Sequence, residues 1–124
     1  MRLNLFLACS LFLVTLCGSV LAAAPALPGS YWNLMALEEK GKPIKESENP
    51  PDVEFLASGK YGILHYGGMR QEGTYTSSGD HVSMKTEDGE DYITGTTTWN
   101  EATGTLEIDS GKWIMRLRVR KIGK

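Results

Sequence analysis

The stretch Gly73-Thr74-Tyr75-Thr76-Ser77-Ser78-Gly79-Asp80-His81-Val82-Ser83-Met84-Lys85 decides the fold of this 124-residue chain. Both of its flanks contain the β-branched and aromatic residues that are typical of strands. Between them, Ser78-Gly79-Asp80 favours a tight turn, because glycine adopts positive φ and short polar side chains bond to the nearby backbone. The stretch therefore predicts a hairpin with strands over Gly73–Thr76 and His81–Lys85.

The same alternation of strand-like and turn-like segments continues in both directions. Further turn signals are Gly41-Lys42-Pro43, Ser58-Gly59-Lys60, Gly67-Gly68, Asp88-Gly89-Glu90, Asn100–Gly104 and Asp109-Ser110-Gly111. Between these turns the other predicted strands are Tyr31–Leu37, Val53–Leu56, Tyr61–Tyr66, Tyr92–Trp99, Thr105–Ile108 and Trp113–Val119. Apolar residues do not recur at helical spacing, and at most one short helical turn is expected, over Glu38–Lys45.

Eight short strands joined mostly by tight turns predict an all-β fold, an eight-stranded antiparallel up-and-down barrel. Closure of such a meander removes the exposed edges through which sheets aggregate. Alternation along the strands gives the side chains expected to point inward: Trp32, Leu34, Val53, Phe55, Tyr61, Ile63, Val82, Met84, Tyr92, Leu106, Ile108, Trp113, Met115, Leu117 and Val119. Tyr31, Tyr66, Tyr75 and Trp99 are expected on the opposite faces or at strand ends.

The first 24 residues predict a cleaved signal peptide rather than part of the fold. Arg2 precedes an apolar block that ends in Ala22-Ala23-Ala24, and Pro25 and Pro28 follow. A basic start, an apolar middle and small residues at the exit are typical of an export signal, with cleavage expected between residues 22 and 26. The alternative is retention as a membrane anchor, because about 19 apolar residues could just cross a bilayer. The remaining chain, residues 27–124, is expected to form one exported domain in the bacterial periplasm or outside the cell, without a stable membrane span.

Removal of this signal leaves a disulfide-free domain of modest negative charge. Cys9 and Cys17 both lie within the signal, and so does Arg2, which leaves 12 Lys and Arg against 15 Asp and Glu, a formal net charge of −3. Nucleic-acid binding needs a basic face. The basic cluster Arg116, Arg118 and Arg120 instead alternates with apolar residues, which predicts a solvated outer face of a strand. Nucleic acid is therefore not an expected partner, and the domain is expected to be a monomer.

Several of these segments resemble a known family. Gly29-Ser30-Tyr31-Trp32-Asn33-Leu34 resembles the opening of bacterial lipocalin-like domains, and Val53–Tyr61 and Gly73–Val82 resemble their following hairpins. The resemblance implies a calycin-type barrel with Trp32 as a structural plug at the closed end. It also implies that a late arginine, Arg116 or Arg118, lies across the Trp32 ring.

A second resemblance is to the META domains of bacterial heat-shock-associated envelope proteins. It rests on the same rhythm of strands and on Gly41-Lys42-Pro43 after the first strand. At the position where META domains typically carry Gly-Gly-Cys-Asn, this chain has Gly67-Gly68-Met69-Arg70.

The sequence contains no constellation typical of an enzyme or a metal site. Its two histidines, His65 and His81, have neither thiolates nor a His-Glu-x-x-His motif beside them, and no Gly-x-Ser-x-Gly motif is present. We therefore predict no enzyme activity, no catalytic residues, no bound metal and no cofactor.

Three function classes remain, of which an enzyme comes last, since it would need a buried carboxylate or histidine with a strongly perturbed pKa. The first is a lipocalin-like module that binds a small apolar or amphipathic molecule in or at the mouth of the barrel. Its candidate ligand-binding residues are Phe55, Tyr61, Ile63, His65, Met84, Tyr92, Trp113 and Met115. The alternative is an envelope protein-protein interaction or inhibitor module with a filled core. A hollow interior favours the first class, and a filled one favours the second.

Overall fold

All eight predicted strands are present in the computed structural model, which describes residues 24–121. They are β1 (Ser30–Glu39), β2 (Asp52–Phe55), β3 (Lys60–Leu64), β4 (Arg70–Ser78), β5 (His81–Thr86), β6 (Asp91–Asn100), β7 (Thr105–Asp109) and β8 (Trp113–Lys121). No helix occurs in the described part of the chain, and a turn follows β1 where one helical turn was allowed. The predicted signal peptide lies outside the described residues, apart from Ala24.

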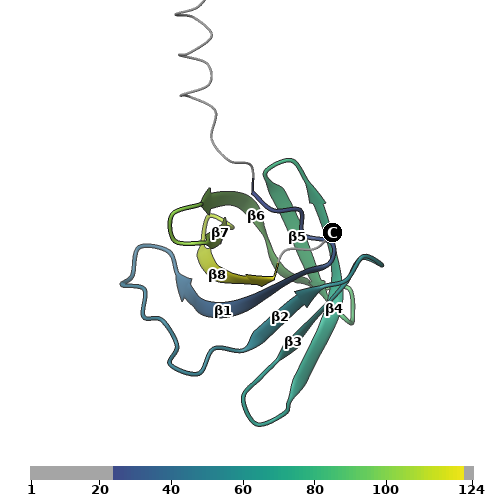
Figure 1. Ribbon diagram of the computed structural model, residues 1–124. Helices are drawn as coiled ribbons and strands as arrows, with labels where there is room; N and C mark the ends of the chain where they lie inside the picture. Colours follow the sequence, from purple (N-terminus) through teal and green to yellow (C-terminus); the bar gives the residue numbers. More distant parts are fainter. Residues whose placement is uncertain (1–23, 122–124) are drawn as a thin grey trace, which may run out of the picture.

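The strands form a closed antiparallel barrel in which each strand pairs with the next (Figure 1). The last strand, β8, returns to pair with β1 along most of its length, from Tyr31 opposite Lys121 to Glu39 opposite Trp113. This up-and-down arrangement confirms the fold class predicted from the turns. It follows from the sequence because short connections between consecutive strands permit only antiparallel neighbours.

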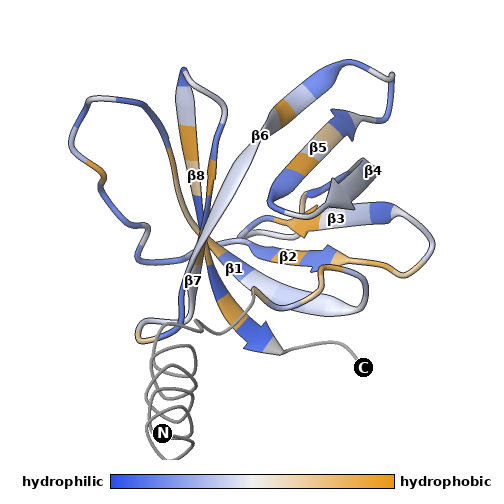
Figure 2. Ribbon diagram, turned by 90° about the horizontal axis from the view of Figure 1, so that it is seen from above, coloured by the Kyte–Doolittle hydropathy of each residue, from blue (hydrophilic) through white to orange (hydrophobic). Residues whose placement is uncertain are grey.

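Apolar and polar residues alternate along the strands, as the banding of β5 and β8 in Figure 2 shows. The apolar residues face the inside of the barrel and form its core. Twelve of the fifteen side chains expected to point inward are buried: Trp32, Leu34, Val53, Phe55, Tyr61, Ile63, Val82, Met84, Leu106, Ile108, Met115 and Leu117. Tyr92 and Val119 are partly buried against this core. Trp113 is different, because 43% of its surface is exposed.

Two aromatic residues expected outside lie inside. Tyr75 is only 6% exposed, stacks edge-to-face on Phe55 with ring centroids 4.9 Å apart, and donates its hydroxyl to the Leu56 carbonyl at 2.7 Å. Trp99 packs edge-to-face against Trp32, at 6.1 Å.

Trp99 was predicted on the outer face, and this prediction is wrong because β6 contains a bulge. Met84 pairs with Ile93 but Lys85 pairs with Asp91, so Tyr92 is an extra residue between them. Beyond the bulge, the residues that point inward on β6 are Ile93, Gly95 and Trp99, whereas an unbroken count from Tyr92 selects the other face.

The two ends of the barrel differ in their connections. We call the end that carries the connections 40–51, 65–69, 87–90 and 110–112 the loop end. The other, the closed end, carries the connections 56–59, 79–80 and 101–104 and the segment that enters β1. There Leu27 is buried in the core, and Gly29 donates its backbone N–H to the Phe55 carbonyl at 2.6 Å. The segment before β1 thus closes this end, and both predicted cleavage points precede Leu27.

Candidate functional site

The predicted ligand-binding residues of the barrel interior are brought together, but they pack against one another. Phe55, Ile63, Met84 and Met115 are all 0% exposed, and Tyr61 is 1% exposed. Tyr92 stacks on Tyr61, with ring centroids 6.1 Å apart and planes 22° apart. A ligand between these side chains would have to displace them, because protein interiors are close-packed.

The larger hollows lie outside this core. Four of them have volumes of about 300 to 340 Å³, and three of these are lined by residues of the outer face or of the loops. The fourth lies at the closed end beside the buried residues Ser30 and Phe55, so within residues 24–121 Phe55 is the one predicted core ligand residue that borders a hollow of this size. Among the described residues, none of the four is lined by Tyr61, Ile63, Met84 or Met115. A binding site is therefore better sought among the surface residues than within the core.

One polar atom within the core has no partner. The Tyr61 hydroxyl is buried and makes no hydrogen bond to the described residues. Burial, and secondarily the charge of Tyr92, raises the pKa of Tyr61 to about 12. Burial also raises the pKa of Tyr92. At neutral pH both phenols are uncharged, so this part of the core offers hydroxyl groups and no charge.

The other two predicted ligand-binding residues lie at the loop end. His65 follows β3 and is half-buried, with Nε2 at 3.3 Å from Gln71 Oε1. Trp113 was predicted to point into the core, and this is corrected: it has the same strand parity as Met115, but it is the first residue of β8, where the hairpin tip leaves it at the barrel mouth.

The predicted contact between an arginine and the Trp32 plug is absent from the described residues. Trp32 is 0% exposed and donates its indole N–H to Ser30 Oγ at 2.7 Å. Arg116 and Arg118 instead point to the outer face, because they alternate with the buried Met115 and Leu117. The cation–π contact of this strand joins Arg120 to Tyr31, at 5.5 Å.

Exposed apolar side chains gather at the loop end. Six large hydrophobic residues of the described chain are exposed, and five of them belong to this end: Leu37, Leu64, Tyr66, Met69 and Trp113. The sixth, Leu56, lies in the β2–β3 turn at the closed end. Tyr66 and Met69 are the most open, at 83% and 71% exposed. Single apolar residues are ordinary on a surface. Of these five, Leu64 and Tyr66 line one common hollow.

A hollow of about 300 Å³ lies beside these residues, and we call it the loop-end pocket. It is lined by Asn33, Glu48, Asn49, Pro50, Asp52, Leu64, His65 and Tyr66. The polar groups of its floor bond to one another: Asn33 Nδ2 donates to Asp52 Oδ1 at 2.9 Å, and Arg120 donates to the same oxygen at 2.8 Å. Asn33 and Asp52 are therefore paired, and the rest of the lining combines the apolar residues Pro50, Leu64 and Tyr66 with the polar residues Glu48, Asn49 and His65.

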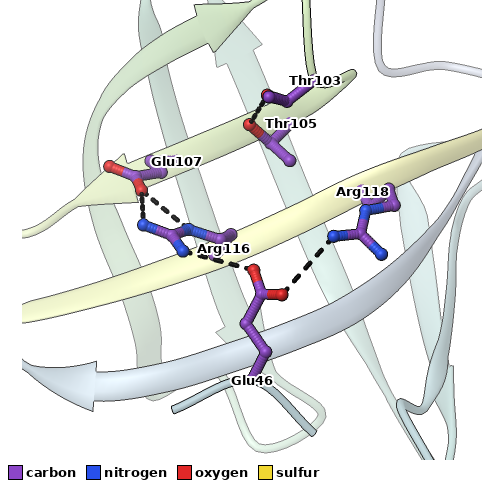
Figure 3. A network of polar contacts seen from close by, with 6 residues as sticks. All are labelled: Glu46, Thr103, Thr105, Glu107, Arg116 and Arg118. Carbon is purple, nitrogen blue, oxygen red and sulfur yellow. Dashed lines mark hydrogen bonds and ion pairs between the residues drawn. The ribbon is translucent and has the colours of Figure 1, made fainter. Parts of the chain in front are cut away.

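A second hollow, of about 330 Å³, lies on the outer face of β6, β7 and β8. We call it the arginine groove, and it is lined by Glu46, Thr98, Asn100, Thr103, Thr105, Glu107, Arg116 and Arg118. Arg116 donates to Glu107 Oε2 through Nε at 2.8 Å and through Nη2 at 2.6 Å. The hydrogen bond with Glu107 is the main reason that the pKa of Arg116 lies above its ordinary value. Figure 3 shows the carboxylate of Glu46 between the two arginines.

The sequence pattern revealed only part of this groove. The alternate spacing of Arg116 and Arg118 placed them correctly on one outer face. The sequence did not indicate that Glu46 contacts these arginines. Glu46 belongs to a connection without regular secondary structure, and its path over β8 depends on tertiary packing.

Within residues 24–121, no group of three or more His, Cys, Asp or Glu side chains is arranged to hold a metal ion. No helix in the same range is long and apolar enough to cross a membrane.

Comparison with known proteins adds no family. The chain matches no protein-family model, no curated protein and no solved structure. The lipocalin-like and META resemblances therefore stay predictions, and an eight-stranded barrel by itself does not distinguish between them.

Proposed function

We propose that this protein is an exported interaction module that binds a partner protein through the loop end of its barrel. The observation that carries the proposal is the filled interior combined with the exposed apolar side chains at one end. The first of these leaves little room for a ligand among the core residues, and the second supplies the surface that a protein partner would cover. Export rests on the sequence of residues 1–24.

The loop-end pocket supports the choice of this end. Binding energy in protein interfaces is concentrated in a few large side chains that fill pockets on the partner. Tyr66 and Leu64 flank such a pocket, and Pro50 stiffens its opposite wall because its φ is fixed. A partner would insert an apolar or aromatic side chain between them.

Charges near the pocket indicate the surroundings of that side chain. The loop end as a whole carries charges of both signs, with Glu87, Asp88 and Glu90 in one connection and Lys42, Lys45 and Lys112 in two others. Glu48, however, lines the pocket itself. Since complementary charges speed association and reject other surfaces, we propose a partner whose apolar anchor has a lysine or arginine beside it, opposite Glu48.

The test compares two leucines of equal exposure at opposite ends of the barrel. Leu64, at the loop end, is 40% exposed, and Leu56, at the closed end, is 39% exposed. A photo-crosslinking residue at position 66 would first identify the partner in the source cells, with position 56 as the control site. With the purified partner, Leu64→Ser should weaken binding by about tenfold or more, the scale of an interface anchor, whereas Leu56→Ser should leave the affinity unchanged.

Three outcomes would contradict the proposal. One is equal crosslinking from positions 56 and 66, and another is an equal loss of affinity in the two serine variants. The third is saturable binding of fatty acids or aromatic probes within the barrel of the unmodified protein, which would favour the small-molecule function instead.

A further inference from the structure

The arginine groove is built by the register of three strands. Thr98 on β6 pairs with Glu107 on β7, and Glu107 pairs with Arg116 on β8. One step further along, Asn100 pairs with Thr105, and Thr105 pairs with Arg118. Directly paired residues share a face of the sheet, so these six side chains form two parallel rows on the outer surface. The two rows place the guanidinium groups of Arg116 and Arg118 beside the carboxylate of Glu107 and the hydroxyl and amide groups of the other three residues.

Glu46 occupies the arginine end of the groove. Its Oε2 accepts from Arg116 Nη1 at 3.2 Å, and its Oε1 accepts from Arg118 Nη2 at 3.4 Å. One carboxylate thus bridges two arginines, one oxygen to each, as Figure 3 shows. These contacts are long for charge-assisted hydrogen bonds, which are usually about 2.7–2.9 Å. By contrast, Glu107 holds Arg116 at 2.6 and 2.8 Å.

The segment that carries Glu46 is tied to the barrel by backbone hydrogen bonds at its two ends, through Lys40 and Pro51, and at one point between them. It belongs to the β1–β2 connection, residues 40–51, which has no regular secondary structure. Near Glu46, the backbone bond from the connection to a strand runs from the Ser47 N–H to the Met35 carbonyl, at 2.8 Å. Withdrawal of Glu46 would break two long ion pairs and leave the tight pair between Arg116 and Glu107 intact.

We propose that the arginine groove binds a small polar carboxylate, which takes the place of Glu46 on Arg116 and Arg118. Glu46 demonstrates that a carboxylate fits between these guanidinium groups. Without it, the two arginines face only Glu107, and the groove gains a net positive charge. The ligand's remaining hydroxyl groups would bond to Thr98, Asn100 and Thr105. A volume of about 330 Å³ lies within the range of small-molecule sites.

The groove lies on the outer face of β6–β8 and shares no lining residue with the loop-end pocket. The proposal does not rest on the protein partner, although Glu46 and Glu48 belong to the same connection, so a movement of Glu46 would reach the pocket as well. In the proposed site Glu46 acts as a built-in competitor. Only molecules in which Glu46 has left the site can bind the ligand carboxylate. The apparent affinity for this ligand is therefore reduced in proportion to the fraction of such molecules.

The experiment is a titration of D-glucuronate, with D-glucose as the uncharged control, followed by calorimetry or by NMR shifts of groove residues. Glu46→Ala should bind D-glucuronate about fivefold or more tightly than the unmodified protein, because the competitor is removed. Adding Arg118→Ala to Glu46→Ala should weaken that binding by about tenfold, since a charge-assisted pair is lost. D-glucose should not bind.

Arg120 offers a matched control for Arg118. Both belong to β8 and point outward, and their side chains are 47% and 48% exposed. Arg120 pairs with Asp52, outside the groove. Arg120→Ala in the Glu46→Ala background should therefore leave D-glucuronate binding unchanged.

Four results would overturn the proposal. They are no saturable binding of D-glucuronate to Glu46→Ala, equal binding of D-glucose, an equal loss of affinity in the Arg120 and Arg118 variants, and binding of inorganic phosphate as tight as that of D-glucuronate. The last result would assign the groove to anions in general rather than to carboxylates.

Discussion

Tyr61 illustrates how the sequence predicts the face of a residue better than its role. Strand alternation placed it inside, as the structure confirms, and its hydroxyl suggested a polar contact for a ligand. In the barrel, Tyr61 pairs with Gly73, where a Cβ atom would lie 2.6 Å from the Tyr61 hydroxyl oxygen. Gly73 therefore makes room for the ring, and the hydroxyl is buried among groups that do not bond to it. This packing depends on residues distant in the sequence.

Tyr61→Phe should leave the stability at neutral pH unchanged or raise it by about 1 kcal/mol, because the variant removes a buried group without a partner. Its clearer effect is expected in alkali. Burial raises the pKa of Tyr61 from 10.0 to about 12. The neutral phenol is therefore favoured by the folded state, and its stabilising contribution is complete below pH 10 and is lost as the pH rises toward 12. Urea unfolding at pH 7 and pH 11 checks both expectations.

At pH 11 this loss amounts to about 1 kcal/mol for one such tyrosine, and Tyr61→Phe should not show it. Part of the alkaline loss should persist, because burial also raises the pKa of Tyr75 and of Tyr92. Tyr66→Phe is the control, since Tyr66 is 83% exposed. An identical pH dependence in Tyr61→Phe and the unmodified protein would contradict the assignment.

At the scale of single strands, the sequence predicted existence and order but not every face. Turn chemistry at the glycines located all seven connections, and the strand ends differ from prediction by at most a few residues. The bulges were not predictable. In β1 the register moves from Leu34 opposite Leu117 to Ala36 opposite Arg116, with Met35 as the extra residue. A bulge is decided by how two strands fit together, so neither strand alone signals it.

Gly95 marks the point at which β6 changes partners. The pairing with β5 runs through Gly95 opposite Val82 to Thr96 opposite His81, and the pairing with β7 begins at Thr96 opposite Asp109. A Cβ atom at Gly95 would collide with the backbone carbonyl of Asp109. Since a backbone carbonyl cannot rotate aside as a side chain does, the seam between β6 and β7 requires glycine here.

Gly95→Ala should therefore destabilise the barrel by about 2 kcal/mol or more, in the range of overpacked cores. Gly62→Ala is the matched control, because the atoms that its Cβ would meet belong to the guanidinium end of Arg70. This side chain is 40% exposed and can move aside by giving up its ion pairs with Glu54 and Glu72, which costs less than moving a backbone carbonyl. Thermal unfolding of both variants tests the difference. If Gly95→Ala and Gly62→Ala unfolded at the same temperature, the contact between β6 and β7 would tolerate a side chain, and closure of the barrel would not require glycine at position 95.

For the molecule as a whole, the sequence predicted a barrel of the correct strand number but left its interior undecided. That question depends on volumes. The aromatic and methionine side chains of the interior suit either a pocket lining or a packed core, and only their mutual contacts distinguish the two. The surface sites were less visible still, because the arginine groove combines β6, β7 and β8 with Glu46, which lies 70 residues from Arg116.

A cavity cut into the core tests whether the barrel is filled. Met84 is 0% exposed, and Met84→Ala should cost about 2–5 kcal/mol, the usual range for truncation of a large buried side chain. The space left behind is lined by apolar groups, and cavities of this kind stay dry and accept benzene-sized guests. We therefore expect benzene to raise the unfolding temperature of Met84→Ala and to leave that of the unmodified protein unchanged.

Met69→Ala serves as the control, because Met69 is 71% exposed at the loop end and its truncation opens no cavity. If benzene or a fatty acid stabilised the unmodified protein as much as Met84→Ala, the interior would already be hollow, and small-molecule binding within the barrel would replace the loop end as the proposed function.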